Sequence, residues 1–226
     1  MNFSTIFKMG MPYLLEGAKT TIGCAILAIL FGLIIGFISC LMGISKNPIL
    51  KAISKAYVWV IRGTPMIVQA YLVFFGYPQI YKLITGVNAP FDNFWGGVIT
   101  LSLNAGAYLS EVFRGGIMAV HQGQTEAARS LGLSSFKTMM KVVLPQAFKI
   151  SLPSMVNQFI ITVKDTSILS AVGLAEIVNK ARTVATATYS FFETYMLVGA
   201  FYLVIISALM VLSMYIEKRL NNGRKG

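Results

Sequence analysis

Long apolar stretches separated by short polar segments dominate this chain, and they predict its secondary structure. A membrane-crossing helix needs about 20 consecutive, mostly apolar residues. We expect five such spans, at Thr20–Met42, Ala56–Tyr81, Asn93–Val120, Ile150–Leu174 and Thr194–Ile216. The pattern therefore predicts an all-α membrane protein with five transmembrane helices.

The fourth of these stretches is interrupted by charge. Only Ile150–Val163 lies before Lys164 and Asp165, and a further apolar piece, Ile168–Leu174, follows them. Because these 14 uncharged residues are too few to cross a membrane, we expect a break near Asp165. A break exposes backbone polar groups, which a membrane tolerates only against protein or a water-filled cavity.

The segments around the spans divide the chain into three parts. A weakly amphipathic N-terminal interfacial segment is expected at 1–19, a transmembrane domain at 20–217 and a basic tail at 218–226. In the first span, Gly32 and Gly36 lie on one helical face. Small residues at this spacing favour close contact with another helix.

Composition agrees with a membrane protein. The chain is 56% hydrophobic and only 12% charged, against about 25% charged residues in soluble domains, and its mean hydropathy is +0.70. The net charge is +11. No run of basic residues with interleaved surface aromatics is present, so we expect no nucleic-acid partner and assign the basic residues to the lipid bilayer surface.

The basic residues are distributed unequally between the two sides that five spans define. Thirteen of nineteen fall on one side, namely Lys46, Lys51, Lys55, Arg62, Arg114, Arg129, Lys137, Lys141, Lys149, Lys218, Arg219, Arg224 and Lys225. Cytoplasmic loops carry the excess of Lys and Arg. We therefore expect the C-terminus and the polar insert at about 125–133 in the cytoplasm, and the N-terminus outside.

The polar insert predicts a short helix. Thr125 is a suitable N-cap, Glu126 complements the positive end of the helix dipole, and Gly132 can end the helix in a left-handed conformation. Ala127 and Ala128 favour helix and leave room for close approach by another protein. About two turns of isolated helix are marginal in water, so docking is expected to stabilise it. The alternative is a polar loop without a partner.

Two places carry polar residues that suit a substrate. Arg62 and Gln69 are seven residues apart on one predicted helical face, and Arg62 can bind a carboxylate with two parallel hydrogen bonds. Lys164 and Asp165, with Asn157 two turns earlier, offer both signs of charge inside the membrane, where charge usually marks a pathway. The alternatives are a snorkelling Arg62 and a structural polar patch around Lys164.

Other chemistry finds little support. The chain lacks the G-x-x-x-x-G-K-[ST] loop of nucleotide-binding motors, contains one His, and has no spacing that suggests a metal site at Cys24 or Cys40. No enzyme activity, metal or cofactor is therefore expected. Glu111 and Arg114 are three residues apart on one helix and are expected to pair.

The insert also carries a family resemblance. Glu126-Ala127-Ala128, followed by Gly132, Val142 and Leu144-Pro145 at fixed spacing, resembles the EAA signature of ABC-importer permease subunits, which usually has Ile where this chain has Val142. Further segments resemble the polar amino-acid branch of that family, and they are Ile61–Pro65, Asn104–Tyr108, Glu111–Gly116, Gly123–Gln124 and Lys164–Ser167. The resemblance covers roughly residues 15–220.

The resemblance implies a type I importer fold in a bacterial inner membrane. Its implied partners are a second permease, either a copy of this chain or a paralogue, two cytoplasmic ATPases that bind the ATP, and an extracellular or periplasmic amino-acid-binding protein. It implies ATPase coupling through Glu126, Ala127, Ala128, Arg129 and Gly132. It also implies that the substrate is contacted by a group of polar residues, namely Arg62, Gln69, Asn157, Lys164 and Asp165.

The charges of these residues favour a neutral or anionic polar amino acid, with glutamine and cystine as examples. An ion-coupled secondary transporter is the alternative. Such transporters usually contain inverted repeats, and no repeat is apparent in the sequence.

Overall fold

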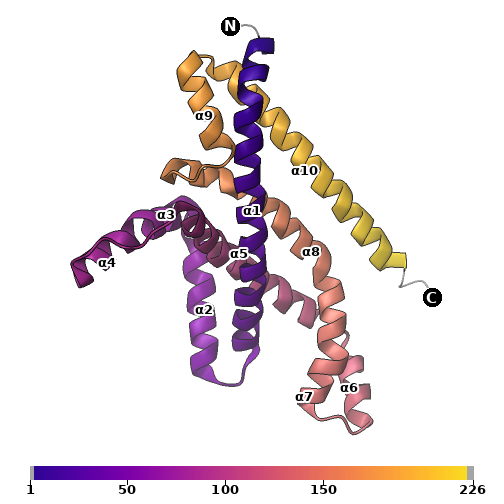
Figure 1. Ribbon diagram of the computed structural model, residues 1–226. Helices are drawn as coiled ribbons and strands as arrows, with labels where there is room; N and C mark the ends of the chain where they lie inside the picture. The colour runs from indigo at the N-terminus through magenta and orange to yellow at the C-terminus, as the bar shows by residue number, and fades with distance from the viewer. Residues whose placement is uncertain (1–2, 223–226) are drawn as a thin grey trace.

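The computed structural model describes residues 3–222, and their regular secondary structure is helical throughout (Figure 1). The elements are α1 (Phe3–Ile44), α2 (Pro48–Gly63), α3 (Met66–Tyr71), the π-helix η1 (Leu72–Gly76), α4 (Tyr77–Thr85), α5 (Asn93–Met118), α6 (Gln122–Ser130), α7 (Ser135–Thr138), the π-helix η2 (Met139–Val143), α8 (Leu144–Asp165), the 3₁₀-helix η3 (Thr166–Val172), α9 (Ile177–Thr188) and α10 (Phe191–Asn222). The predicted all-α fold is thus observed for these residues.

Helix α1 is the central post of the molecule (Figure 1). It has 42 residues, which is roughly 63 Å of helix. No helix boundary separates the expected interfacial segment from the first span, and Ile6 and Leu14 in that segment are 0% and 1% exposed. Residues 1–2, and the expected tail from residue 223 onward, lie outside the described residues.

Helices α1 and α5 pack closely through glycines. A Cβ added at Gly36 would lie 2.8 Å from the carbonyl oxygen of Gly106, and one at Gly32 would lie 3.2 Å from the Cβ of Ala105. Farther along, a Cβ at Gly97 would lie 3.2 Å from the Sγ of Cys24. The predicted helix contact at Gly32 and Gly36 is therefore confirmed, and α5 is its partner.

The second span predicted at 56–81 is not one straight helix, because the chain turns by 106° between α2 and the following helical segment. Thr64 is extended, with φ −117° and ψ 145°, as expected for a residue before a proline. Pro65 then begins the next helix without an N–H to continue the previous ladder. The segment α3–η1–α4 leaves the body as an arm, at the left of Figure 1.

The predicted break in the fourth span is confirmed. Helix α8 ends at Asp165 and continues directly as η3. The Thr166 hydroxyl donates to the Val163 carbonyl at 2.8 Å, and the Ser167 hydroxyl donates to the Lys164 carbonyl at 2.7 Å. Side chains of the break itself thus satisfy carbonyls that the end of an α-helix leaves open.

The end of the molecule near the N-terminus is closed by α9 and α10. Gly17 of α1 allows the backbone of α9 to approach, since an added Cβ would lie 2.7 Å from the Cα of Ile177. Glu176 is fully buried. Its carboxylate accepts the Asn179 N–H at 2.7 Å and the Tyr202 hydroxyl at 3.0 Å, which ties α9 to α10.

The predicted number of five spans is not confirmed. Within residues 3–222, two helices are long and apolar enough to cross a membrane unaided, Phe3–Ile44 and the Phe191–Lys218 part of α10. The bent pair of α2 with Met66–Thr85 adds a third if it counts as one span. Helices α5 and α8 carry charged residues within their length, including Glu111 and Lys164, which lowers their hydropathy.

We predict that Gly36→Ala destabilises the protein by about 1–3 kcal/mol, because the new methyl group overlaps α5 backbone and forces the helices apart. A lower midpoint of thermal unfolding in detergent would show this. Gly115→Ala is the matched control, since no atom of the described residues lies within 4 Å of an added Cβ there. Equal midpoints for the two variants would contradict the proposed role of the α1–α5 contact.

Candidate functional site

The polar insert is helix α6, and it begins earlier than its sequence predicts. The predicted N-cap Thr125 is wrong, because the helix already starts at Gln122. His121 caps it instead, and its Nδ1 accepts the N–H of Gly123 at 3.1 Å. Histidine is not among the residues preferred at an N-cap, so its residue type does not predict this role.

The predicted end of the insert helix is confirmed. Gly132 has a positive φ of 83°, its N–H donates to the Arg129 carbonyl at 3.0 Å, and the Leu133 N–H donates to the Ala128 carbonyl at 3.2 Å. This pair of bonds is the Schellman arrangement. The Arg129 side chain adds a bond from Nη1 to the Leu133 carbonyl at 2.8 Å, so Arg129 holds the turn together.

The two alanines of the insert lie in different environments. Ala128 is only 5% exposed and faces the rest of the protein, whereas Ala127 and Glu126 are exposed. Two large apolar side chains near them are also open, Leu131 at 83% and Phe136 at 73% exposed. The surface that another protein can reach is therefore made by Glu126, Ala127 and these apolar neighbours.

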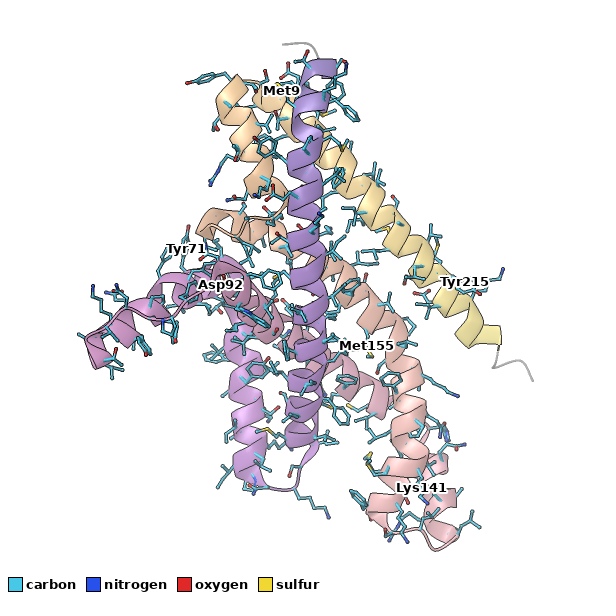
Figure 2. The ribbon with its side chains drawn as sticks, in the orientation of Figure 1. Met9, Tyr71, Asp92, Lys141, Met155 and Tyr215 are labelled. Carbon is cyan, nitrogen blue, oxygen red and sulfur yellow. The ribbon has the colours of Figure 1, made fainter. Side chains whose placement is uncertain are left out.

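Helix α6 is joined to the main body on both sides. Three residues separate it from the end of α5 at Met118. On the other side the chain returns through α7 and η2 into α8. Figure 2 shows Lys141 of η2 beside the insert and Met155 of α8 farther from it. Helix α8 lies against α5 at Gly116, where an added Cβ would lie 2.8 Å from the Ala147 carbonyl. A force on α6 therefore acts on α5 and α8 together.

A cavity of about 990 Å³ lies between α1, α2 and the last turns of α5. Of the described residues that line it, four are cationic and one is acidic, namely Lys51, Lys55, Arg62, Arg114 and Glu111. Helix α2 forms one wall but contributes only Ser54 to the buried residues. Ser54 donates to the Ser39 carbonyl of α1 at 2.7 Å, so a polar contact holds this wall in place.

Arg62 lines this cavity from the last turn of α2. Its Nη1 lies 3.9 Å from Oε2 of Glu111 on α5, and its guanidinium carbon lies 5.2 Å from the centre of the Tyr108 ring. Arg114 holds Glu111 more closely, with Nε donating to Oε1 at 3.1 Å. The predicted Glu111–Arg114 pair is confirmed. Sequence reasoning missed the link from Glu111 to Arg62, because no pattern relates the two helices.

Gln69 does not share a helical face with Arg62, because the chain bends between them, and that prediction is wrong. The Gln69 side chain is buried. Its Nε2 donates to the Ile61 carbonyl at 2.7 Å and to the Thr64 hydroxyl at 2.9 Å. Its Oε1 accepts Nδ2 of Asn104 at 3.1 Å. Gln69 therefore fastens both sides of the bend to each other and to α5.

The structure places the remaining predicted contacts away from Arg62. Asn157 lines a cavity between α8 and α10 with Ser213 and Glu217. Lys164 lines a separate, mostly apolar one with Tyr202 and other residues. Asp165 is half-buried at the end of α8. Asn157 and Lys164 thus lie on the side of α8 that faces α10, so the five predicted residues do not form one pocket.

Comparison with known proteins places the chain in a family. The profile of the "Binding-protein-dependent transport system inner membrane component" family matches residues 28–223. The chain belongs to this family. The resemblance to ABC-importer permeases that the EAA-like insert predicts is thereby confirmed.

Relatives of known name cover nearly the whole chain. The "Arginine transport system permease protein ArtQ" of Bacillus subtilis is 35% identical over 213 residues, 94% of each chain. The "Putative glutamine transport system permease protein GlnP" of Rickettsia felis is 34% identical over 92% of this chain and 93% of its own. The "Nopaline transport system permease protein NocM" of Agrobacterium fabrum is 36% identical over 93% and 88%.

Solved structures support the fold. A crystal structure titled as an amino acid ABC transporter with histidines has a TM-score of 0.88 and 35% identity, and the match covers 97% of this chain and 99% of that one. An inward-facing structure of the MetNI methionine ABC transporter has a TM-score of 0.73 at 17% identity, covering 93% and 97%. The second likeness supports the fold alone.

We predict that Gln69→Leu destabilises the protein by about 1–3 kcal/mol, because it leaves the buried amide of Asn104 and the carbonyls at the bend without their partner. Thermal unfolding in detergent measures the effect. Gln79→Leu is the control, because Gln79 is exposed on α4 and makes no hydrogen bond through its side chain among the described residues. A Gln69→Leu variant as stable as the control would show that the bend does not depend on this amide.

Proposed function

We propose that this chain is the transmembrane subunit of an ATP-driven amino-acid importer. The observation that carries the proposal is the set of relatives named as arginine, glutamine and nopaline transport permeases, which are 34–36% identical over more than nine-tenths of this chain. In this function the chain forms part of the translocation pathway and transmits motion from separate ATPases. It carries no ATPase site of its own.

The assembly we propose has a second permease, two ATPases and an amino-acid-binding protein. The insert helix α6 faces the cytoplasm with the C-terminus, and the N-terminus lies outside. The asymmetric distribution of Lys and Arg supports this orientation. The exposed Glu126, Ala127 and Leu131 support α6 as the surface that meets an ATPase.

The substrate we propose is a neutral or anionic polar amino acid, such as glutamine or cystine. Arg62 binds it in the cavity between α1, α2 and α5, and Gln69 holds the bend beside that cavity. Asn157, Lys164 and Asp165 contact it farther along the path, on α8. The excess of cations around Arg62 supports a substrate that carries a carboxylate without a compensating positive side chain.

Reconstitution tests this function directly. The chain is co-purified with its ATPases and binding protein, inserted into proteoliposomes and supplied with ATP on the ATPase side. We expect uptake of labelled amino acid that requires ATP and continues after ionophores remove all ion gradients. Uptake that follows an ion gradient and ignores ATP would replace the proposal with an ion-coupled transporter.

We predict that Ala127→Trp prevents stable binding of the ATPase subunits, because the indole ring occupies the space that an exposed alanine leaves for a partner. Co-purification of tagged permease with ATPase measures this. Ala187→Trp is the matched control, since Ala187 is an exposed alanine of α9 at the opposite end of the molecule (Figure 1). Ala128 is unsuitable, because it is buried within the chain itself.

If the Ala127→Trp and Ala187→Trp variants recover equal amounts of ATPase, α6 is not the docking surface. The importer function would then need another contact with its motor.

A further inference from the structure

We propose that Arg62 and Glu111 together bind the α-carboxylate and the α-ammonium group of the transported amino acid, in the cavity between α1, α2 and α5. This inference rests on the proposed function and deepens it. It adds Glu111 as a substrate contact and Tyr108 and Arg114 as residues that position the two charged groups.

The guanidinium of Arg62 is open for a ligand. An arginine carries five N–H donors in a planar fork, yet within residues 3–222 the Arg62 side chain donates no hydrogen bond. Its contacts are the 3.9 Å approach to Glu111 and the face of the Tyr108 ring. The ring holds the guanidinium by a cation–π interaction, and the N–H fork has no hydrogen-bond acceptor among the described residues.

Glu111 is fixed where it can meet the other end of a zwitterion. Arg114 donates to both of its oxygens, with Nε to Oε1 at 3.1 Å and Nη2 to Oε2. An ionised carboxylate has about four acceptor positions, so Glu111 retains capacity for an ammonium group. An amino acid that places its carboxylate on Arg62 and its ammonium on Glu111 replaces the long 3.9 Å pair with two direct, charge-assisted contacts.

The charges around the site restrict the substrate class. Lys51 and Lys55 line the same cavity, and neither forms an ion pair with any described residue. Among the described residues that line the cavity, Glu111 is the single acid, and two arginines share it. A substrate with a positive side chain would face like charge without a second acid, whereas a neutral or acidic side chain would not. We therefore assign neutral and acidic amino acids to this site.

The position of the pair connects the site to the insert helix. Arg62 belongs to the last turn of α2, immediately before the bend, and Glu111 belongs to the part of α5 that leads into α6. Substrate bound between them bridges the two segments. The cavity that Lys164 lines offers no such pair, because its described lining contains no acidic residue.

Isothermal titration of the purified wild-type complex tests the site. The probes are L-glutamine, L-cystine, L-glutamate and L-arginine, together with 4-aminobutanamide, which lacks the α-carboxylate of glutamine, and N-acetylglutamine, which lacks the α-ammonium group. We expect neutral or acidic amino acids to bind more tightly than arginine, and both analogues to bind less tightly than glutamine. Preferred binding of arginine, or no binding of any probe, would overturn the proposal.

Variants identify the contacts separately. Arg62→Ala should weaken glutamine binding by roughly 10- to 100-fold, the range for a lost charged hydrogen bond, and should leave 4-aminobutanamide unaffected. Arg62→Lys, which keeps the charge without the fork, should lie between, and it guards against misfolding of the alanine variant. Glu111→Gln should weaken glutamine binding but leave N-acetylglutamine binding unchanged. Lys82→Ala, at an exposed lysine of α4, is the control.

The outcomes separate this site from the function itself. If wild-type protein imports amino acid with ATP but Arg62→Ala and Glu111→Gln bind glutamine normally, the site is wrong and the function stands. If the same variants instead lose binding of phosphatidylglycerol in mixed micelles, the cavity holds a lipid headgroup and the proposal is also wrong. If wild-type proteoliposomes import no amino acid, the proposed function fails first.

Discussion

Close contact between α1 and α5 is the constraint on which the rest of the structure depends. At Gly36 the two backbones are so near that even a methyl group would overlap the Gly106 carbonyl. The contact extends from Cys24 and Gly97 to Gly36 and Gly106, about 18 Å of α1. Between apolar helices in lipid, such close packing supplies much of the association energy, because burial of apolar surface supplies little.

The neighbours of this pair are attached in different ways, some by close packing at glycines and one by polar side chains. Helix α8 packs against α5 at Gly116, and α9 packs against α1 at Gly17. Helix α2 is held mainly by polar side chains, including Ser54 and the Tyr57 hydroxyl, which donates to the Leu103 carbonyl at 2.7 Å. The cavity with Arg62 opens along this less tightly packed helix. The insert helix, by contrast, follows α5 after three residues, so its motion is expected to displace α5 relative to α2.

Local signals in the sequence predicted the local features well. Gly132 ends the insert helix because a left-handed residue was needed there, and Lys164 and Asp165 indicate the break that η3 occupies. The large angle of the bend at Thr64–Pro65 is not predictable in this way, because apolar residues on both sides of a proline indicate a single span. The role of His121 as a cap is not predictable from its residue type, which is uncommon in that position.

Features that depend on two distant segments could not be predicted in this way. From the sequence, Gln69 is interpreted as a polar residue on a substrate pathway. Only the fold shows that its amide is hydrogen-bonded to the Ile61 carbonyl at the bend and to Asn104. Glu111 reads as the partner of Arg114, and only the packing of α2 beside α5 brings Arg62 to it. Asn157 and Lys164 share a face of α8, as their spacing requires, but that face is directed at α10.

The most direct test of this account is a pair of distance measurements by pulsed electron paramagnetic resonance, in the reconstituted complex with and without ATP. One pair of spin labels, at the exposed Ile26 and Ile99, measures the distance between α1 and α5. A second pair, at the exposed Val60 and Met118, measures the distance between α2 and the end of α5. Cys24 and Cys40 are replaced by serine, so that only the chosen positions are labelled. The account predicts that ATP leaves the first distance unchanged and alters the second. A change in the α1–α5 distance with a constant α2–α5 distance would contradict it.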